Sequence, residues 1–473
     1  MAAGARGLLV LVALVVVAYL PFIGGGFLTD DFVHLDRLSQ VRSVGDVVNA
    51  PDAFGFFRPV TQATLYAEAL IHPSTAPLFR LTNVVLQAIV LIAAFGVARL
   101  LLPSARGAAF ATLVFALTPK AHPIAVLWIS ARAELLMALC ALVATWAWIV
   151  WVRGGRRVWL VTAVAAYTLA ILSKETAFLL PLALLMVPGA VVPWRRRVAA
   201  GVAFVVVAVL VFLWRIEAGA IIPGTVDPHY TLATPLFRWW RNARNYAGRL
   251  LPEPLAAVIL LSVAGALQRR ASRAEFRNHE PGTLNPANPE QRTRNQWNRE
   301  PGTTNVERAL TIFALVWVAV FLLPVLPVVA RNELYLYLPA FGVSLLAAQV
   351  IESFADPSRR SLRVWQAIAI FAVAAGTYQV SRSRELHREL VFSAGLVDTV
   401  ARTNGPGRIL LVGEDEDTRQ LIKDTVADYL PAVLRLAAPD GRLIAADSEH
   451  PEAQGVIRVR CSYHDGRLVF ARN

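Results

Sequence analysis

Long apolar segments recur along the first 380 residues of the chain and are separated by short charged breaks. A helix needs about 20 predominantly apolar residues to cross a hydrocarbon layer of about 30 Å. Several segments are slightly shorter, so we expect their ends to extend into flanking polar residues or their helices to lie deep in a bundle. The pattern predicts a polytopic α-helical membrane protein with about eleven transmembrane helices, at residues 8–23, 78–102, 107–121, 131–152, 158–172, 176–192, 198–214, 251–267, 309–329, 334–351 and 364–380.

The first apolar segment and the residues after Ser381 differ from the other spans. The first segment resembles a signal peptide, but its apolar run is long and further spans follow, so we interpret it as an uncleaved first span. From about Ser381 the pattern changes to shorter elements. We expect helices at SRSRELHRELVFSAGLVDTVARTNG and DTRQLIKDTVADYLPAVLRL, strands at RILLVGE and GRLIAAD, and a final strand hairpin at GVIRVRCSYHDGRLVFARN. We therefore predict a transmembrane domain at residues 1–380 and a small α/β domain at residues 381–473.

One polar stretch interrupts the transmembrane domain. Residues 268–308 lack hydrophobic periodicity, are rich in Pro, Gly, Asn and Arg, and contain the near-repeat NHEPGTLN and NREPGTTN. Such a composition does not bury enough apolar surface to offset the entropy of ordering the chain. We expect a disordered cytoplasmic insert without a catalytic role.

The composition supports the membrane class and excludes a nucleic-acid binder. Of the 473 residues, 56% are hydrophobic and only 17% are charged, although the formal net charge is +13. Soluble domains are usually about 45–50% apolar, and a basic nucleic-acid-binding protein is far more polar. We interpret the positive charge as a determinant of membrane topology. The two cysteines, Cys140 and Cys461, have no metal-binding spacing and are not expected to form a disulfide.

The arginines predict the orientation. If the N-terminus is cytoplasmic, arginine-rich connections all fall inside, as the positive-inside rule requires. These connections are residues 99–106, 153–157, 194–197, 268–308 and 358–363. An odd number of spans then places the C-terminal domain outside a bacterial plasma membrane.

The outer loop at residues 215–250 departs from this trend because it carries Arg238, Arg241, Arg244 and Arg249. Two interpretations remain open and are compatible with each other. The loop binds an anionic ligand, or its segment FRWWRNARNYAGRL forms an amphipathic helix on the lipid headgroups.

Two adjacent acids, Asp30 and Asp31, follow the first span directly in the stretch GGGFLTDDFVHLD. A carboxylate at the membrane boundary can act as a general base that activates an acceptor hydroxyl, or it can bind a divalent cation. The structural alternative is helix capping by Thr29 or Asp30.

Further ionisable residues fall on the same predicted outer face. Charged groups at membrane depth are costly, so they are usually paired or functional. Each also has a structural alternative. Arg58 contacts lipid headgroups, His122 is a hydrogen-bonded histidine at the membrane interface, Lys174 and Glu175 form a plain turn, and the tyrosines belong to an aromatic belt. Arg132 and Glu134 are two residues apart on a helix, so we expect different partners for each. Acids and bases on one face above a lipid bilayer suit a reaction on a lipid-linked phosphate donor. The candidates for binding this donor or its acceptor are Arg58, His122, Arg132, Glu134, Lys174, Glu175, Arg331 and Tyr335.

The order of several short motifs resembles the GT-C membrane glycosyltransferases. The motifs are TDDF, FRPVTQATLY, LFRLTNVVLQAIV, ALTPKAHPIAVLWISARAELLMAL, LSKETAFLLPLALL and RNELYLYLPAFGVSLL, and the resemblance covers about residues 8–352. The sequence is most similar to bacterial homologues of the transmembrane and TPR-containing O-mannosyltransferases, kin to the protein O-mannosyltransferases. Unlike the eukaryotic relatives, it has no TPR array after the membrane part.

The resemblance implies a GT-C-like fold, a polyprenyl-phosphate-linked sugar donor, inverting transfer and a catalytic acid in the first outer loop. On this chain that acid is Asp30 or Asp31, with a slight preference for Asp31. The acceptor of the relatives does not transfer to this chain, because a small α/β domain stands in place of the TPR array. We expect an extracytoplasmic protein or glycan hydroxyl as the acceptor, and the scheme requires no metal or cofactor.

Two rival functions remain. A transporter or lipid flippase would also be polytopic, but such proteins often show internal repeats and charges at the midplane. No repeat relates the halves of this chain, and its charges gather at one face. A membrane scaffold acting through the C-terminal domain is the second rival.

Overall fold

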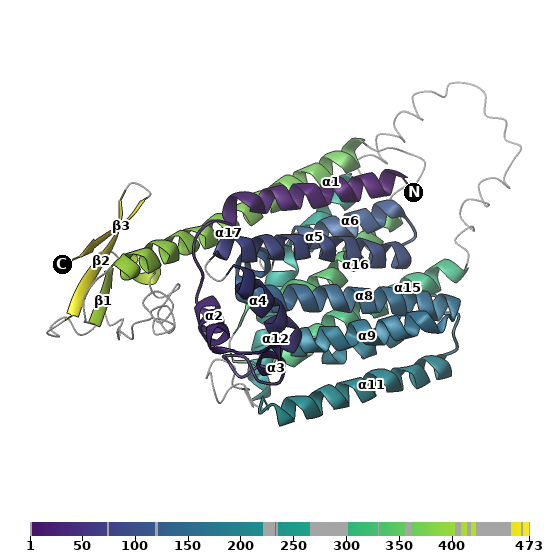
Figure 1. Ribbon diagram of the computed structural model, residues 1–473. Coiled ribbons are helices and arrows are strands. Elements are labelled where there is room, and N and C mark those ends of the chain that lie inside the picture. The colour runs from purple at the N-terminus through teal and green to yellow at the C-terminus, as the bar shows by residue number, and fades with distance from the viewer. Residues whose placement is uncertain are drawn as a thin grey trace, which may run out of the picture.

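The helices of the transmembrane part run roughly parallel to one another and form one bundle (Figure 1). The main helices are α1 (Ala2–Tyr19), α5 (Ala76–Leu101), α6 (Ala105–Ala116), α8 (Arg132–Gly154), α9 (Arg157–Ser173), α10 (Leu180–Leu185), α11 (Trp194–Glu217), α15 (Pro301–Leu322), α16 (Tyr337–Phe354) and α17 (Leu362–Arg402). A further helix spans Pro252–Ala264. This computed structural model describes residues 2–72, 75–118, 122–220, 232, 235–264, 301–329, 331–354, 362–402, 408–413, 418–421, 456–464 and 467–472.

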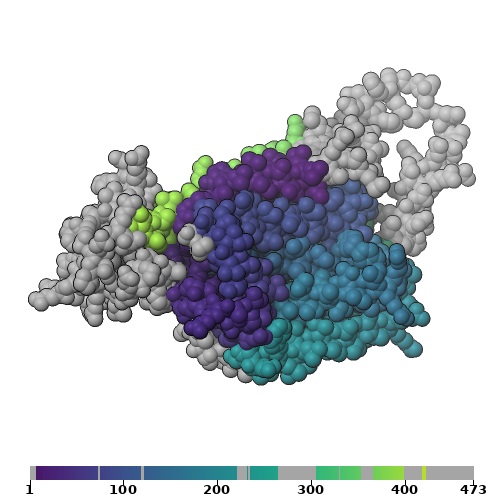
Figure 2. Space-filling view, viewed as in Figure 1, coloured from purple at the N-terminus to yellow at the C-terminus, as the bar shows by residue number. Residues whose placement is uncertain are grey.

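Large apolar side chains cover the outside of the bundle. On α5 the exposed residues Leu81, Val85, Ile89 and Ile92 form a stripe at helical spacing. Helix α11 is exposed almost all round, and Phe204 is one of its few buried residues. In the space-filling view α1 and α11 lie at opposite edges of the body (Figure 2). An apolar exterior of this extent requires a lipid environment, so the chain is an integral multi-pass membrane protein.

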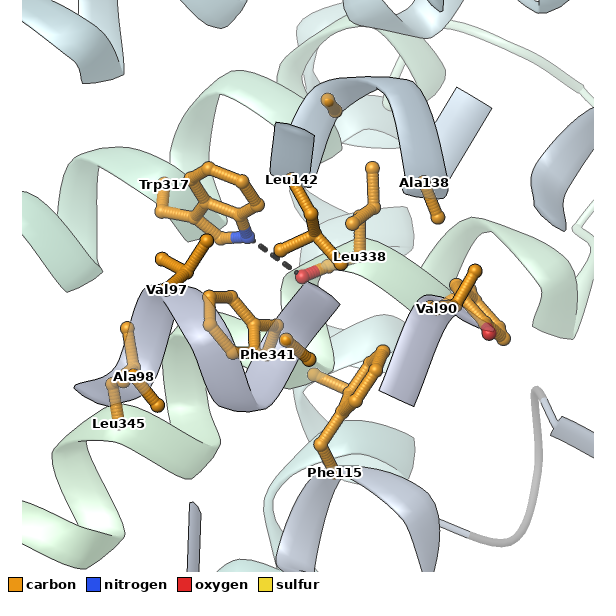
Figure 3. Close-up of a cluster of buried hydrophobic side chains, with 14 of the residues drawn as sticks. Val90, Val97, Ala98, Phe115, Ala138, Leu142, Trp317, Leu338, Phe341 and Leu345 are labelled. Atoms are coloured by element: carbon orange, nitrogen blue, oxygen red, sulfur yellow. Dashed lines mark hydrogen bonds between the residues drawn. The ribbon is translucent and has the colours of Figure 1, made fainter. Parts of the chain in front are cut away.

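The interior of the bundle is packed by aromatic and aliphatic side chains from α5, α6, α8, α15 and α16 (Figure 3). Trp317 on α15 donates its indole N–H to the Leu338 carbonyl of α16 at 2.8 Å. Phe341 packs edge-on against both Trp317 and Phe115. A Cβ on Gly342 would lie 2.8 Å from the Ala314 carbonyl oxygen. The glycine therefore permits the close approach of α15 and α16.

Each of the eleven predicted spans coincides with a helical segment, but the helices differ in length. Among the described residues, five helices are long and apolar enough to cross a membrane, or six if Leu236–Leu250 and Pro252–Ala264 form one bent span. Helices α6 and α10 are shorter, and α6 is almost completely buried against its neighbours. The count of eleven crossings therefore stays a prediction.

Two predicted boundaries differ from the structure. Helix α15 begins at Pro301, inside the stretch predicted as a disordered insert. Proline is well tolerated in the first turn of a helix, because the N–H that it lacks has no partner there. Residues 268–300 lie outside the described part of the chain. The boundary at 380 falls within α17, which continues without interruption to Arg402.

The C-terminal part contains a three-stranded sheet in the order β1 (Arg408–Gly413), β2 (Val456–His464) and β3 (Arg467–Arg472). Strands β1 and β2 are parallel, whereas β2 and β3 are antiparallel, with His464 opposite Arg467. The predicted first strand and final hairpin are thus confirmed. The intervening helix and the strand GRLIAAD fall largely outside the described residues, so the complete α/β domain stays a prediction.

Shorter helices gather at one end of the bundle, the end from which α17 extends toward the sheet (Figure 1). They include α2 (Asp30–Gln40), α3 (Val44–Val48), α4 (Pro59–Ile71) and α12 (Leu236–Leu250). The candidate catalytic and binding residues lie on or next to these helices.

Candidate active site

The two adjacent acids form the first turn of α2. Thr29, directly before them, has a φ of 35°, a conformation that side chains other than glycine rarely adopt. Its side chain makes no capping hydrogen bond, so capping by Thr29 does not explain this stretch. Strained backbone of this kind is often found at functional sites.

Asp31 is buried and its carboxylate is held on both oxygens. Oδ1 accepts hydrogen bonds from the Ser130 N–H at 2.7 Å and the Ser130 hydroxyl at 2.5 Å, and Oδ2 accepts one from the Leu28 N–H at 3.0 Å. Ser130 lies in η2 (Ile129–Ala131), just before α8. Burial raises the pKa of Asp31, although these hydrogen bonds and the charge of Arg80 act in the opposite direction.

Asp30 occupies the neighbouring position on the same turn and is only partly buried. A carboxylate in the first turn is favoured by the partial positive charge of the helix N-terminus. The structure therefore separates the two acids by environment: Asp31 is fixed inside the protein, and Asp30 is accessible.

Arg80 on α5, which is not among the residues predicted from the sequence, fixes the loop that leads to the acids. Its guanidinium donates to the backbone carbonyls of Ile23, Gly24 and Gly25 at 2.9, 3.2 and 3.3 Å, and also to that of Gly26. Nε donates to the Leu127 carbonyl at 2.9 Å. Arg80 has no exposed surface. Its position within an apolar span was the only signal in the sequence, because a buried arginine there requires several acceptors.

Helix α17 contacts the other side of this loop. The Gly26 N–H donates to the Leu390 carbonyl at 2.7 Å, and the Ser393 hydroxyl donates to the Phe27 carbonyl. A Cβ on Gly25 would lie 2.7 Å from the Leu390 Cβ, and one on Gly26 would lie 2.7 Å from the Ala394 nitrogen. These two glycines therefore allow the backbone of the loop to contact the helix directly.

Arg58 and Glu175 form a bidentate ion pair beside α4. The Arg58 Nε and Nη2 donate to the two carboxylate oxygens at 3.0 and 2.7 Å, and the guanidinium lies 3.9 Å from the centre of the Phe56 ring. Burial alone would raise the pKa of Glu175, but the charge and hydrogen bonds of Arg58, with the charges of Arg215 and Lys174, lower it to about 2.

Lys174 and Glu134 form a second, buried ion pair next to the first. The Lys174 ammonium also lies 5.1 Å from the centre of the Tyr335 ring, within the range of a cation–π contact. Tyr335 belongs to η7 (Glu333–Leu336). The structure thus brings together five predicted residues from four segments: Arg58, Glu134, Lys174, Glu175 and Tyr335.

Arg132 is separate from this group and has a structural environment. It pairs with Glu68 of α4 at 2.5 Å and donates to the Asn83 side chain and the Phe79 carbonyl at 2.9 Å each. The expectation that Arg132 and Glu134 have different partners is confirmed. Because the Arg132 donors are occupied within the protein, the geometry favours a role in joining α4, α5 and α8.

His122 is fully buried in α7 (His122–Leu127). Its Nδ1 lies 2.9 Å from the Gln87 side-chain nitrogen, and its ring packs against Phe115 and Tyr337. Within the described part of the chain, these hydrogen-bond and ring contacts do not join His122 to the two ion pairs. The neighbouring Lys120 lies outside the described residues.

Arg331 is exposed and donates from Nε to the Asn242 side-chain oxygen of α12 at 2.9 Å. The Asn242 amide nitrogen donates to the carbonyls of Leu326 and Val328 at 2.9 and 3.0 Å. Arg331 therefore connects the segment before η7 to α12. Within the described residues, no group of three His, Cys, Asp or Glu side chains is arranged to hold a metal ion.

The comparison with protein families gives one match. Residues 59–216 match the family model described as dolichyl-phosphate-mannose-protein mannosyltransferase. The match runs from α4 to α11 and includes Arg80, Ser130, Lys174 and Glu175, whereas the two acids of α2 precede it. A search of curated protein sequences finds no significant match.

The structure is similar to that of ArnT from Cupriavidus metallidurans bound to undecaprenyl phosphate. The TM-score is 0.52 at 14% sequence identity, and the alignment covers 97% of this chain and 93% of that chain. The archaeal oligosaccharyltransferase AglB from Archaeoglobus fulgidus, in complex with an inhibitory peptide and a dolichol-phosphate, gives a TM-score of 0.46 at 12% identity, with 93% and 64% coverage. The family match and the ArnT-like fold confirm the resemblance to GT-C membrane glycosyltransferases.

Proposed function

We propose that the chain transfers a sugar from a polyprenyl-phosphate-linked donor to a hydroxyl group of an extracytoplasmic protein or glycan. The proposal rests most directly on one observation. The accessible carboxylate of Asp30, the half-buried Arg58 and the buried Lys174 lie at the same end of a lipid-facing bundle. The fold of this bundle is similar to that of ArnT, whose structure contains undecaprenyl phosphate. Mannose is the first sugar to test, because the description of the matching family names it.

Asp30 is the better candidate for the general base. A base must reach the proton that it removes, and Asp30 is partly exposed while Asp31 has a relative exposure of 1%. Both oxygens of Asp31 already accept hydrogen bonds from the protein. We therefore reverse the preference drawn from the sequence and assign Asp31 to positioning the first turn of α2.

Arg58 and Lys174 are the candidates for binding the donor phosphate. Glu175 and Glu134 hold these cations in place, and Arg215 contributes a third positive charge nearby. Cations fixed before the substrate arrives stabilise charge that develops on the leaving phosphate, without reorganisation during the reaction.

The proposed reaction is a single displacement. The acceptor hydroxyl oxygen attacks the anomeric carbon as Asp30 takes its proton, and the bond between that carbon and the phosphate oxygen breaks. The products are the glycosylated acceptor and polyprenyl phosphate, with inversion at the anomeric carbon. The same topology that places the N-terminus in the cytoplasm places this reaction on the extracytoplasmic side.

The test uses the purified full-length protein in lipid nanodiscs with polyprenyl-phosphate mannose and other polyprenyl-phosphate hexoses. Nucleotide sugars serve as the control donors. We expect release of polyprenyl phosphate and glycosylation of a peptide or glycan acceptor with at least one lipid-linked donor. In proteoliposomes, movement of the intact donor between leaflets without cleavage would instead support the transporter or flippase alternative and contradict this proposal.

A further inference from the structure

Helix α12 carries an exposed surface that the proposed reaction does not use. Leu236, Phe237 and Trp240 expose 75%, 65% and 72% of their surface. Arg238, Arg241 and Arg244 are also exposed, and among the described residues no ion pair involves any of these three arginines. The same helix therefore presents large apolar side chains and unneutralised cations together.

The opposite face of α12 is fixed to the bundle. Asn242, Tyr246 and Leu250 are buried, and their spacing of four residues places them on one side of the helix. Asn242 bonds to the carbonyls of Leu326 and Val328. On this fixed side, Arg249 pairs with Glu333 at 3.3 Å, in contrast to the three outward arginines.

The position of α12 places its free surface at the boundary of the membrane. The helix lies at the end of the bundle that carries α2, α3 and α4 (Figure 1). It is joined at Leu251 to the apolar helix Pro252–Ala264, and the chain bends by 43° between the two. Three exposed arginines with no ion-pair partner in the described part of the chain are too costly to bury in hydrocarbon. Exposed Trp, Phe and Leu, in contrast, favour contact with acyl chains. A helix with both features is stable at the level of the headgroups.

We propose that α12 binds the anionic headgroups of the surrounding bilayer. Leu236, Phe237 and Trp240 insert beside the acyl chains, and Arg238, Arg241 and Arg244 pair with lipid phosphates. Guanidinium groups suit this role because their planar donors match phosphate oxygens in pairs. The alternative ligand with the same chemistry is a free phosphate, but a soluble anion would not account for the three exposed apolar side chains.

The test compares backbone hydrogen exchange of residues 236–250 in nanodiscs of phosphatidylcholine and in nanodiscs that also contain phosphatidylglycerol. The test variant is R238Q/R241Q/R244Q. The matched control, R156Q/R195Q/R196Q, removes three exposed arginines near the starts of α9 and α11, at the other end of the bundle. Inorganic phosphate added to phosphatidylcholine nanodiscs is the third arm.

For the wild type and the control variant, we expect phosphatidylglycerol to slow exchange in α12 by about tenfold or more, and high salt to reduce the effect. The α12 variant should lose this slowing while it keeps the exchange pattern of the remaining helices. Equal slowing in the α12 variant, or no slowing in the wild type, would overturn the proposal. Slowing by inorganic phosphate alone would assign the arginines to a soluble anion and would also overturn it.

Discussion

At the scale of single residues, two neighbouring acids acquire different chemistry from their surroundings. Asp31 is enclosed by Ser130, Leu28 and Arg80, so its carboxylate fixes the start of α2. Asp30 is one residue away and partly exposed. A role for adjacent acids thus depends on which of them the fold leaves accessible.

His34, one turn after Asp30, gives a prediction about stability and pH. Burial, with the charges of Arg58 and Arg37, lowers the pKa of His34 to about 4, although Asp52 acts in the opposite direction. The unfolded chain takes up a proton at about pH 6.5, and the folded protein does so only near pH 4. Stability from the neutral histidine is therefore present above pH 6.5 and is lost as the pH falls toward 4, by roughly 3 kcal/mol.

The measurement is the melting temperature in detergent across this pH range. We expect the wild type to lose more thermal stability on acidification than His34→Gln, whose side chain does not titrate. Parallel pH profiles for the two proteins would contradict the assignment of a buried neutral histidine.

At the scale of elements, the loop that leads to Asp30, residues 23–29, is held between α5 and α17. Arg80 binds the loop carbonyls from one side, and Leu390 and Ser393 contact it from the other. The helix that leads to the C-terminal sheet is therefore part of the scaffold of the candidate site.

The three consecutive glycines of this loop, Gly24 to Gly26, provide a matched test. Gly26→Ala would place a Cβ 2.7 Å from the Ala394 backbone nitrogen, whereas Gly24→Ala meets only the His387 ring, at 3.7 Å. We expect Gly26→Ala to displace the first turn of α2 and to reduce sugar transfer by about 100-fold, the scale expected for a small misplacement. Gly24→Ala should transfer sugar at close to the wild-type rate. Equal activity of both variants would show that α17 does not constrain the loop.

The sequence predicted the positions of the helices well because hydrophobic runs report burial or lipid contact directly. It also predicted a helix directly after residue 380, which α17 confirms by continuing to Arg402. It did not predict that this helix is continuous with the last span. The backbone stays helical there because a change from apolar to polar residues marks only the membrane surface. The sequence also did not identify the partners of its charged candidates. Arg58 and Glu175 are 117 residues apart, and Lys174 and Glu134 are 40 apart, so only the tertiary fold brings them together.

At the scale of the whole molecule, the charged candidates and the exposed α12 surface lie at one end of the bundle, and the described arginine-rich connections at residues 99–106, 153–157 and 194–197 lie at the other. This arrangement follows the positive-inside rule if the candidate site faces outward.

Ser130, which binds the Asp31 carboxylate, was not predicted from the sequence, because a serine before a span has no charge to mark it.

Labelling of engineered cysteines tests the orientation. Arg241→Cys on α12 and Arg196→Cys on α11 are both exposed positions at opposite ends of the bundle. Both are made in a background in which the native Cys140 and Cys461 are replaced by serine. We expect a membrane-impermeant thiol reagent to label the first variant in intact cells and the second only after the membrane is opened. The reverse pattern would place the candidate site in the cytoplasm.

The central claim is that Asp30 takes the proton of the acceptor hydroxyl. The most direct measurement is the rate of sugar transfer from a polyprenyl-phosphate donor by Asp30→Asn, with Asp46→Asn, an exposed acid of α3 at the same end of the bundle, as the control. Loss of a general base predicts a rate lower by about 10²- to 10⁴-fold for Asp30→Asn with unchanged melting temperature, and a wild-type rate for the control. Transfer at the wild-type rate by Asp30→Asn would contradict the account.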